Sequence, residues 1–253
     1  MLEVFNPLLL DLPFRPEIAG LEINLHLVLE YLAFIVGFRY YVVLRKKSRD
    51  AISDGNRLSI IVGATFGALI GSRLVGWLED PLPTLYQANW LTLLNIKTIM
   101  GGLFGGLLGV ELAKKMVGET QSSGDLFTLP IIAGIFIGRI GCFLAGTTEF
   151  TYGMETSFFL GMDLGDGLQR HPLALYELLF LILLFLYLKN VQKKGKLPSG
   201  YLFQYFMISY FGFRFLIEFL KPNDFTFLGL SSIQYLCLLC FLYYRKTIVS
   251  VFK

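Results

Sequence analysis

The stretch DLFTLPIIAGIFIGRIGCFLAG, residues 125–146, decides the class of fold. A helix of about 20 apolar residues crosses a bilayer core of about 30 Å, and this stretch has that length. Its one basic residue, Arg139, falls in the last third. An arginine at that depth costs about 2.5 kcal/mol or more unless it faces a bundle interior or a wet cavity. The stretch therefore predicts a membrane helix whose cation faces other helices.

The composition of the whole chain agrees with this prediction. Of 253 residues, 55% are hydrophobic and 16% are charged, whereas soluble domains are roughly 25% charged. The mean hydropathy is +0.61. The net charge of +3 gives no electrostatic footprint for a nucleic-acid partner. We therefore expect an integral membrane protein that binds no nucleic acid.

Other apolar stretches of similar length predict an all-α, polytopic membrane helix bundle. We expect seven transmembrane helices within one membrane domain, residues 1–253, at the following ranges: 21–44, 58–79, 98–113, 125–145, 172–190, 200–220 and 228–244. Gly, Pro and polar residues separate these ranges.

The distribution of Lys and Arg among the loops predicts the orientation of the helices. Alternate loops and termini carry 14 basic residues on one side of the membrane and four on the other. Cytoplasmic loops hold the excess of basic residues in membrane proteins. The N-terminus is therefore expected outside and the C-terminus inside.

Three arginines lie at one depth within the predicted helices. Arg73, Arg139 and Arg214 each fall in the last third of a helix that runs from inside to outside. Three cations in the outer half of the membrane imply a common cavity or an anionic ligand. Because a guanidinium group matches a phosphate bidentately, a lipid phosphate is the favoured ligand.

Acidic and polar residues are expected at the same depth. They are Glu30, His171, Tyr176, Glu177 and Glu218. Glu218 follows Arg214 by four residues and shares its helical face, so a purely structural ion pair is an alternative for these two residues.

Small residues and cysteines recur in the predicted helices. Gly101, Gly105 and Gly109 repeat every four residues, and Gly134 and Gly138 repeat that spacing. Such a period lets helices approach closely, so close packing explains these glycines at least as well as catalysis does. Cys237 and Cys240 have no second pair that would complete a metal site, so we expect packing roles for them and no metal.

Four segments together resemble the prolipoprotein diacylglyceryl transferase family. They are GGLFGGLLGVELAKK (residues 101–115), GRIGCFLAGTTEFTYG (138–153), RHPLALYE (170–177) and FGFRFLIEFLKPND (211–224), and the GSRL motif around Arg73 accompanies them. The resemblance implies an enzyme of the bacterial cytoplasmic membrane whose active site faces the outer leaflet. It implies transfer of the diacylglyceryl group of phosphatidylglycerol to the lipobox cysteine thiol of a prolipoprotein, with release of glycerol phosphate and no cofactor.

The resemblance also implies roles for single residues. Arg139 would hold the lipid headgroup, Arg214 and Glu218 would belong to the essential site, and Tyr176 and Glu177 would shape its mouth. The remaining residues expected to bind substrate are Arg73, Glu30, His171, Gly141 and Cys142.

Two positions depart from the family pattern. Phe104 stands where many members have a histidine, and Cys142 stands where an asparagine is common. Phe104 cannot accept a proton, so the candidates for the base are Glu218, Glu30 and His171. The alternative function is a lipid- or anion-binding membrane protein, or a transporter, without transferase activity.

Three further expectations concern the neighbourhood of this segment. An apolar surrounding would leave the Cys142 thiol unreactive and structural. His26 is expected to be an ordinary bundle or interfacial histidine. The loop from Thr147 to Gln169 is long for a compact bundle and is expected to form part of an outer lid.

Overall fold

The computed structural model describes residues 11–48, 50–79, 96–195, 197–223 and 226–251. It is mostly helical, and the described ranges contain four helical segments long and apolar enough to cross a membrane: Leu25–Lys47, Asp54–Glu79, Asp125–Thr148 and Leu173–Lys194. The coarse prediction of a helical membrane protein is therefore confirmed.

Each of the seven predicted ranges holds a helix. These helices are α1 (Leu25–Lys47), α2 (Asp54–Glu79), α5 (Ile99–Val117), α6 (Asp125–Ala145), α7 (Leu173–Lys194), α8 (Tyr201–Ile217) and α9 (Ser232–Tyr243). Two 3-10 turns, η1 (Gly146–Thr148) and η2 (Glu218–Leu220), extend α6 and α8, and α10 (Arg245–Val251) follows α9. Because α8 and α9 have 17 and 12 residues, against the ~20 that a crossing takes, seven crossings stay a prediction.

Local sequence signals set several helix ends. The Asn24 side chain accepts a hydrogen bond from the Leu27 N–H and caps α1. Ser231 and Gln234 form a reciprocal capping box at the start of α9. Gly118 ends α5 with a φ of 70°, a left-handed conformation that suits glycine.

Two short antiparallel hairpins lie outside the helices. Strands β1 (Glu17–Ile18) and β2 (Leu21–Glu22) pair just before α1, so the predicted start of the first membrane helix at residue 21 was wrong. Strands β3 (Met162–Asp163) and β4 (Gln169–Arg170) pair within the segment between α6 and α7.

The described helices group into two compact units. The first unit comprises Met1–Ser48, Gly124–Phe206 and Phe219–Pro222, and the second comprises Arg49–Ser123, Met207–Glu218 and Asn223–Lys253. The prediction of one membrane domain stays a prediction.

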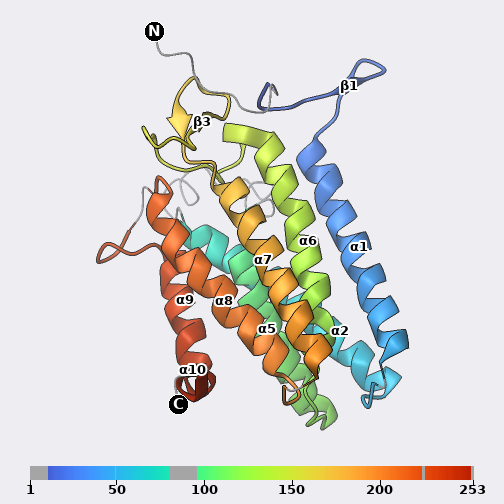
Figure 1. The fold of residues 1–253 in the computed structure, drawn as a ribbon. Coiled ribbons are helices and arrows are strands. Elements are labelled where there is room, and N and C mark those ends of the chain that lie inside the picture. The colour runs from blue at the N-terminus through green and yellow to red at the C-terminus, as the bar shows by residue number, and fades with distance from the viewer. Residues whose placement is uncertain (1–10, 49, 80–95, 196, 224–225, 252–253) are drawn as a thin grey trace. The chain divides into compact units, whose positions relative to one another are not determined.

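In the first unit, α6 lies between α1 and α7 (Figure 1). The rings of Tyr41 on α1 and Phe127 on α6 stack with their centroids 4.3 Å apart. At the start of α6, the Asp125 carboxylate accepts hydrogen bonds from the backbone N–H groups of Gly200 and Phe203, at 2.6 and 3.1 Å. These contacts fix the end of the unit where α6 begins.

In the second unit, α2 and α5 pack through facing glycines. A Cβ atom added at Gly101, Gly105 or Gly109 would collide with the backbone of α2, where the facing residues are Gly71, Gly67 and Gly63. The prediction of close helix packing is confirmed for α5. On α6, a Cβ atom at Gly134 would meet Ala33 O at 3.4 Å, but one at Gly138 would meet nothing within 4 Å. Close packing was therefore the wrong explanation for Gly138.

Candidate lipid-binding and catalytic site

Arg139 and Glu177 form a buried ion pair in the first unit. Arg139 Nε on α6 donates to Glu177 Oε1 on α7 at 2.7 Å, and both side chains are almost fully buried. The two residues are 38 positions apart in the sequence. A buried guanidinium needs such a partner because an unpaired charge away from water is costly. The ion pair fixes the orientation of the arginine on α6.

Cys142 lies beside Arg139, one turn further along α6. Its Sγ atom is 3.6 Å from Arg139 Nη1 and 3.6 Å from His26 Nε2. The expectation of an entirely apolar neighbourhood for this thiol was wrong, because His26 on α1 reaches it from 116 positions away. His26 Nδ1 in turn lies 3.4 Å from Glu149 Oε1.

Gly141 allows this approach of α1 to α6. A Cβ atom at Gly141 would lie 3.1 Å from His26 Cδ2 and 3.2 Å from His26 Cα, closer than side chains usually come. The missing side chain therefore lets His26 pack against α6. Gly141 was expected to bind substrate, and the described contact gives it a packing role next to the site.

His171 and Tyr176 lie together at the start of α7. His171 Nδ1 is 3.1 Å from the Tyr176 hydroxyl. Burial lowers the pKa of His171 below its ordinary value, which favours the neutral ring. The backbone of His171 also bonds to Gly153 and Met154 of the preceding loop. The pair therefore joins this loop to α7.

The second unit contains the ion pair that the spacing predicts. Arg214 Nη2 donates to Glu218 Oε2 at 3.1 Å, and both residues are buried. Glu218 Oε1 also accepts from the Ser231 hydroxyl at 3.3 Å. The predicted pairing of Arg214 with Glu218 is confirmed, and a role for the pair in catalysis stays a prediction.

The remaining predicted residues lie on α1 and α2. Glu30 on α1 is partly buried and follows His26 by four residues, so both lie on the same face of that helix. Arg73 on α2 lies with its Nη1 3.2 Å from Ser72 Oγ and 3.4 Å from Leu69 O. Arg139 belongs to the first unit, and Arg73 and Arg214 belong to the second. Convergence of the three guanidinium groups stays a prediction.

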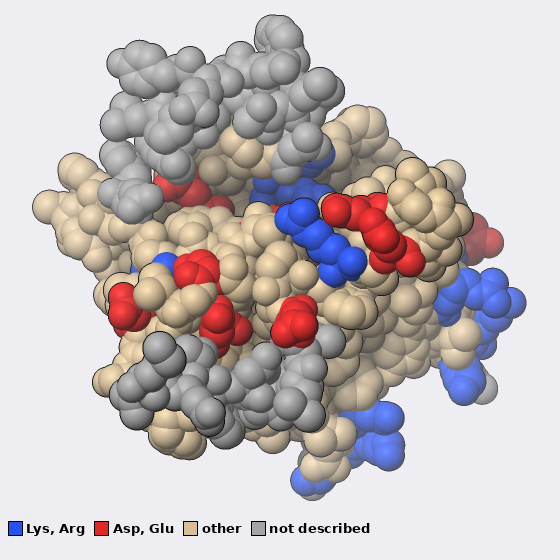
Figure 2. All heavy atoms as spheres, turned by 90° about the horizontal axis from the view of Figure 1, so that it is seen from above, with Lys and Arg blue, Asp and Glu red and all other residues tan. Residues whose placement is uncertain are grey.

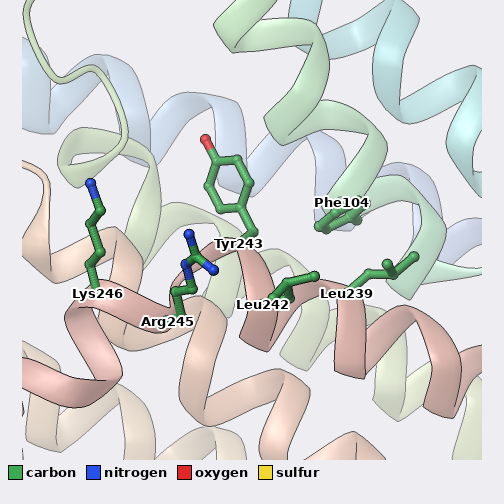
Figure 3. Close-up of a pocket in the computed structure, with 6 residues that line it drawn as sticks. All are labelled: Phe104, Leu239, Leu242, Tyr243, Arg245 and Lys246. Carbon is green, nitrogen blue, oxygen red and sulfur yellow. The ribbon is translucent and has the colours of Figure 1, made fainter.

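Phe104 lines an open pocket of the second unit. The other lining residues are Leu239, Leu242, Tyr243, Arg245 and Lys246. Figure 3 shows Phe104 and Leu239 at one end of the pocket and the two basic side chains at the other. The Phe104 ring also lies 6.4 Å from the Phe211 ring, centroid to centroid. Phe104 thus packs near aromatic and aliphatic side chains, and its own ring cannot accept a proton.

The loop between α6 and α7 folds over the end of its unit. The Asp163 carboxylate accepts from the backbone N–H groups of Gly165 and Gly167, at 2.7 and 3.0 Å. Arg170 pairs with Asp166 at 2.7 Å. Figure 2, which views the molecule from above, shows both acidic and basic side chains at the surface. These hydrogen bonds and the ion pair hold parts of the loop to one another. Its expected function as a lid stays a prediction.

Comparison with known proteins agrees with the four motif segments. The family model described as "Prolipoprotein diacylglyceryl transferase" matches residues 13–249, which is most of the chain. The chain belongs to the prolipoprotein diacylglyceryl transferase family. Arg139 with Glu177, and Arg214 with Glu218, all lie inside the matched range.

Three relatives carry the name phosphatidylglycerol–prolipoprotein diacylglyceryl transferase. The relative from Chlorobaculum tepidum is 31% identical, with 88% of this chain and 84% of the relative covered. The Geobacter sulfurreducens relative is 32% identical over 76% of this chain and 77% of its own. The Bordetella parapertussis relative is 32% identical over 79% and 80%. Membership in a family of membrane transferases, inferred from the motifs, is confirmed.

Sequence reasoning missed His26 and Glu149 as members of this cluster. His26 lies near the start of the first predicted membrane helix, and Glu149 lies within the signature segment, residues 138–153. Arg139 and Glu30 were selected because they are expected at one depth in the membrane, and His26 and Glu149 lie near that depth in the predicted arrangement. The same reasoning could have found both residues, although the contacts of His26 with Cys142 and Glu149 depend on tertiary packing.

Proposed function

We propose that this chain transfers the diacylglyceryl group of phosphatidylglycerol to the lipobox cysteine thiol of prolipoproteins. The observation that carries the proposal is Arg139. This buried arginine lies in the segment that resembles the family signature, and Glu177 holds it at 2.7 Å. Membership in the family and the names of the relatives support the same reaction.

The reaction requires a cationic group such as this arginine. The sulfur of the lipobox cysteine attacks the glycerol carbon, the bond from that carbon to the phosphate oxygen breaks, and glycerol phosphate leaves with the electron pair. Cationic donors stabilise the charge that develops on the departing oxygen. A guanidinium group carries five N–H donors, so it can bind a carboxylate through one edge and a phosphate through another.

The proposal includes the membrane arrangement. The chain would cross the bacterial cytoplasmic membrane seven times with its N-terminus outside and its C-terminus inside, and the site would open to the outer leaflet. Arg214 and Glu218 would complete the essential site. The residues proposed to contact or position the lipid and the precursor are Arg73, Glu30, His171, Tyr176, Gly141 and Cys142.

The test removes both charges of the Arg139–Glu177 pair. A single Arg139→Ala change leaves a buried carboxylate without its partner and costs about 3–5 kcal/mol, so lost activity could simply report misfolding. The double variant Arg139→Leu with Glu177→Leu avoids that cost. We expect it to accumulate in membranes like the wild type but to form less than about 1% of the thioether product, consistent with a lost donor to the developing charge.

The assay uses protein in phosphatidylglycerol vesicles with a lipobox peptide, and mass spectrometry detects the thioether. Arg57 and Asp50 provide the matched control, because they form another buried pair at 2.6 Å. The double variant Arg57→Leu with Asp50→Leu should keep its activity. Full activity of the Arg139 double variant would remove Arg139 from the site. Lipid binding or flux without any thioether from the wild type would favour the binding protein or transporter, which Phe104 also favours.

A further inference from the structure

The reaction needs a proton acceptor for the lipobox thiol, and two of the three residues expected for this role, Glu218 and His171, have other partners. Glu218 pairs with Arg214 and accepts from Ser231. His171 Nδ1 faces the Tyr176 hydroxyl. A group in the first unit, next to Arg139, has the required geometry.

His26, Cys142 and Glu149 form a chain of polar atoms beside Arg139. Glu149 Oε1 is 3.4 Å from His26 Nδ1, and His26 Nε2 is 3.6 Å from Cys142 Sγ. This is the order of a nucleophile or base, its imidazole partner and a carboxylate that orients the ring. Arg139 Nη1 is 3.6 Å from the same sulfur. The sulfur therefore lies between a permanent cation and a ring nitrogen.

A small cavity adjoins the thiol. It is bounded by α6, the loop that follows it and the start of α7, and its lining residues include Cys142, Gly146, Thr151, Tyr152, Leu164 and Pro172. Cys142 is buried, whereas the Glu149 side chain is 43% exposed. A proton accepted at the sulfur could thus leave through His26 and Glu149 toward water.

We propose that Cys142 and His26, oriented by Glu149, are the proton acceptor for the lipobox thiol; this inference rests on the proposed function. The pair holds one proton at rest. It takes a second proton from the lipobox thiol as that sulfur attacks the glycerol carbon and glycerol phosphate leaves. The proton then passes to water, and the pair returns to its resting state.

The test compares the catalytic constants of variants in phosphatidylglycerol vesicles with a lipobox peptide. We expect His26→Gln and Cys142→Ala to lower kcat at least about 100-fold, the usual contribution of a general base, with little change in the KM for lipid. Glu149→Gln should lower kcat by about tenfold. Because Glu149 is half-exposed, this variant leaves no buried charge unpaired. Cys240→Ala, a buried cysteine on α9, is the control and should keep wild-type kcat.

The pH profile separates a base from a merely structural residue. Among the described residues, Glu149 and Arg139 contact the pair, Glu177 binds Arg139, and Glu30 lies on the same face of α1 as His26. The ordinary pKa of a cysteine thiol is about 8.5, so the ionised fraction of the peptide thiol rises by up to about tenfold per pH unit below that value. An ionised thiol needs no base, so the deficit of His26→Gln should shrink by up to about tenfold per pH unit between about pH 6 and pH 8. Unchanged kcat in His26→Gln and Cys142→Ala, or a deficit that does not vary with pH, would overturn the inference while the transferase stands. No thioether from the wild type would remove the proposed function and this inference with it.

Discussion

His171 lies where a positive charge is disfavoured. Its ring is packed between the rings of Phe158 and Tyr176, at centroid distances of 5.9 and 6.0 Å, and burial lowers its pKa. The unfolded chain therefore binds a proton more readily than the folded protein does. Stability must then depend on pH near the ordinary histidine pKa.

The direction of that dependence follows from the sign of the shift. The stabilising effect of the neutral ring is complete above the ordinary pKa of 6.5 and is lost as the pH falls through the lower pKa of the folded state. We expect the thermal midpoint of the purified protein in detergent to fall between pH 7.5 and pH 5.5. In His171→Asn, which keeps a polar group near Tyr176, the fall should be smaller. Equal falls in both proteins would show that His171 does not contribute.

The separation of two residues along the chain decides whether their contact can be predicted from the sequence. Arg214 and Glu218 are four positions apart on one helix, so their pairing follows from helical geometry alone. Arg139 and Glu177 are 38 positions apart, and His26 and Cys142 are 116 apart. Contacts of that separation depend on which helices pack together. The sequence therefore predicted the pair within one helix but not the contacts between helices.

The close contact between α2 and α5 depends on glycines, which have no side chains. A Cβ atom at Gly105 would collide with Gly67 O and would lie 2.9 Å from Gly71 Cα. Backbone atoms cannot turn aside as a flexible side chain can. We expect Gly105→Ala to lower the stability of the protein by about 1–3 kcal/mol, the usual cost of overpacking. Thermal unfolding in detergent measures this change.

The neighbouring residue provides the control for this prediction. A Cβ atom at Gly106 would lie 3.5 Å from Ala64 O and 3.6 Å from Ala68 Cβ, which are ordinary contacts. Gly106→Ala should therefore leave the unfolding midpoint unchanged or slightly raised, because alanine is the better helix former. An equal loss of stability in both variants would contradict close packing through Gly105.

Helix positions were easier to predict than helix ends. The apolar ranges located every described helix from α1 to α9, because burial in lipid requires long apolar segments. The range 98–113 stopped short of Val117, where α5 ends. Lys114 and Lys115 were excluded as polar, yet such side chains extend a helix while their charged ends reach water. Hydropathy locates the apolar part of a helix, whereas capping residues such as Gly118 end it.

Basic residues favour one end of alternate helices from α1 to α7. The last turns of α1, α5 and α7 carry Lys or Arg, whereas those of α2 and α6 carry none. The last two long helices depart from this pattern, because α8 has Arg214 in its last turn and α9 has no basic residue there. Cations near a helix C-terminus stabilise the helix dipole. That effect alone would favour them on every helix, so the pattern from α1 to α7 agrees with the predicted orientation, which stays a prediction.

The orientation predicts which residues a membrane-impermeant maleimide can reach. Glu17 lies before the start of α1 and Lys47 lies at its end, and the three native cysteines are buried. In intact spheroplasts, Glu17→Cys should be labelled at least about tenfold faster than Lys47→Cys or Lys194→Cys. Breaking the membrane should make the two lysine positions react like Glu17→Cys, and the parental protein corrects for any labelling of Cys142. The proposed topology follows from the positive-inside rule, which counts charges near the helix ends. Faster labelling of Lys47→Cys than of Glu17→Cys would invert this topology and would move the Arg139 site away from the outer leaflet.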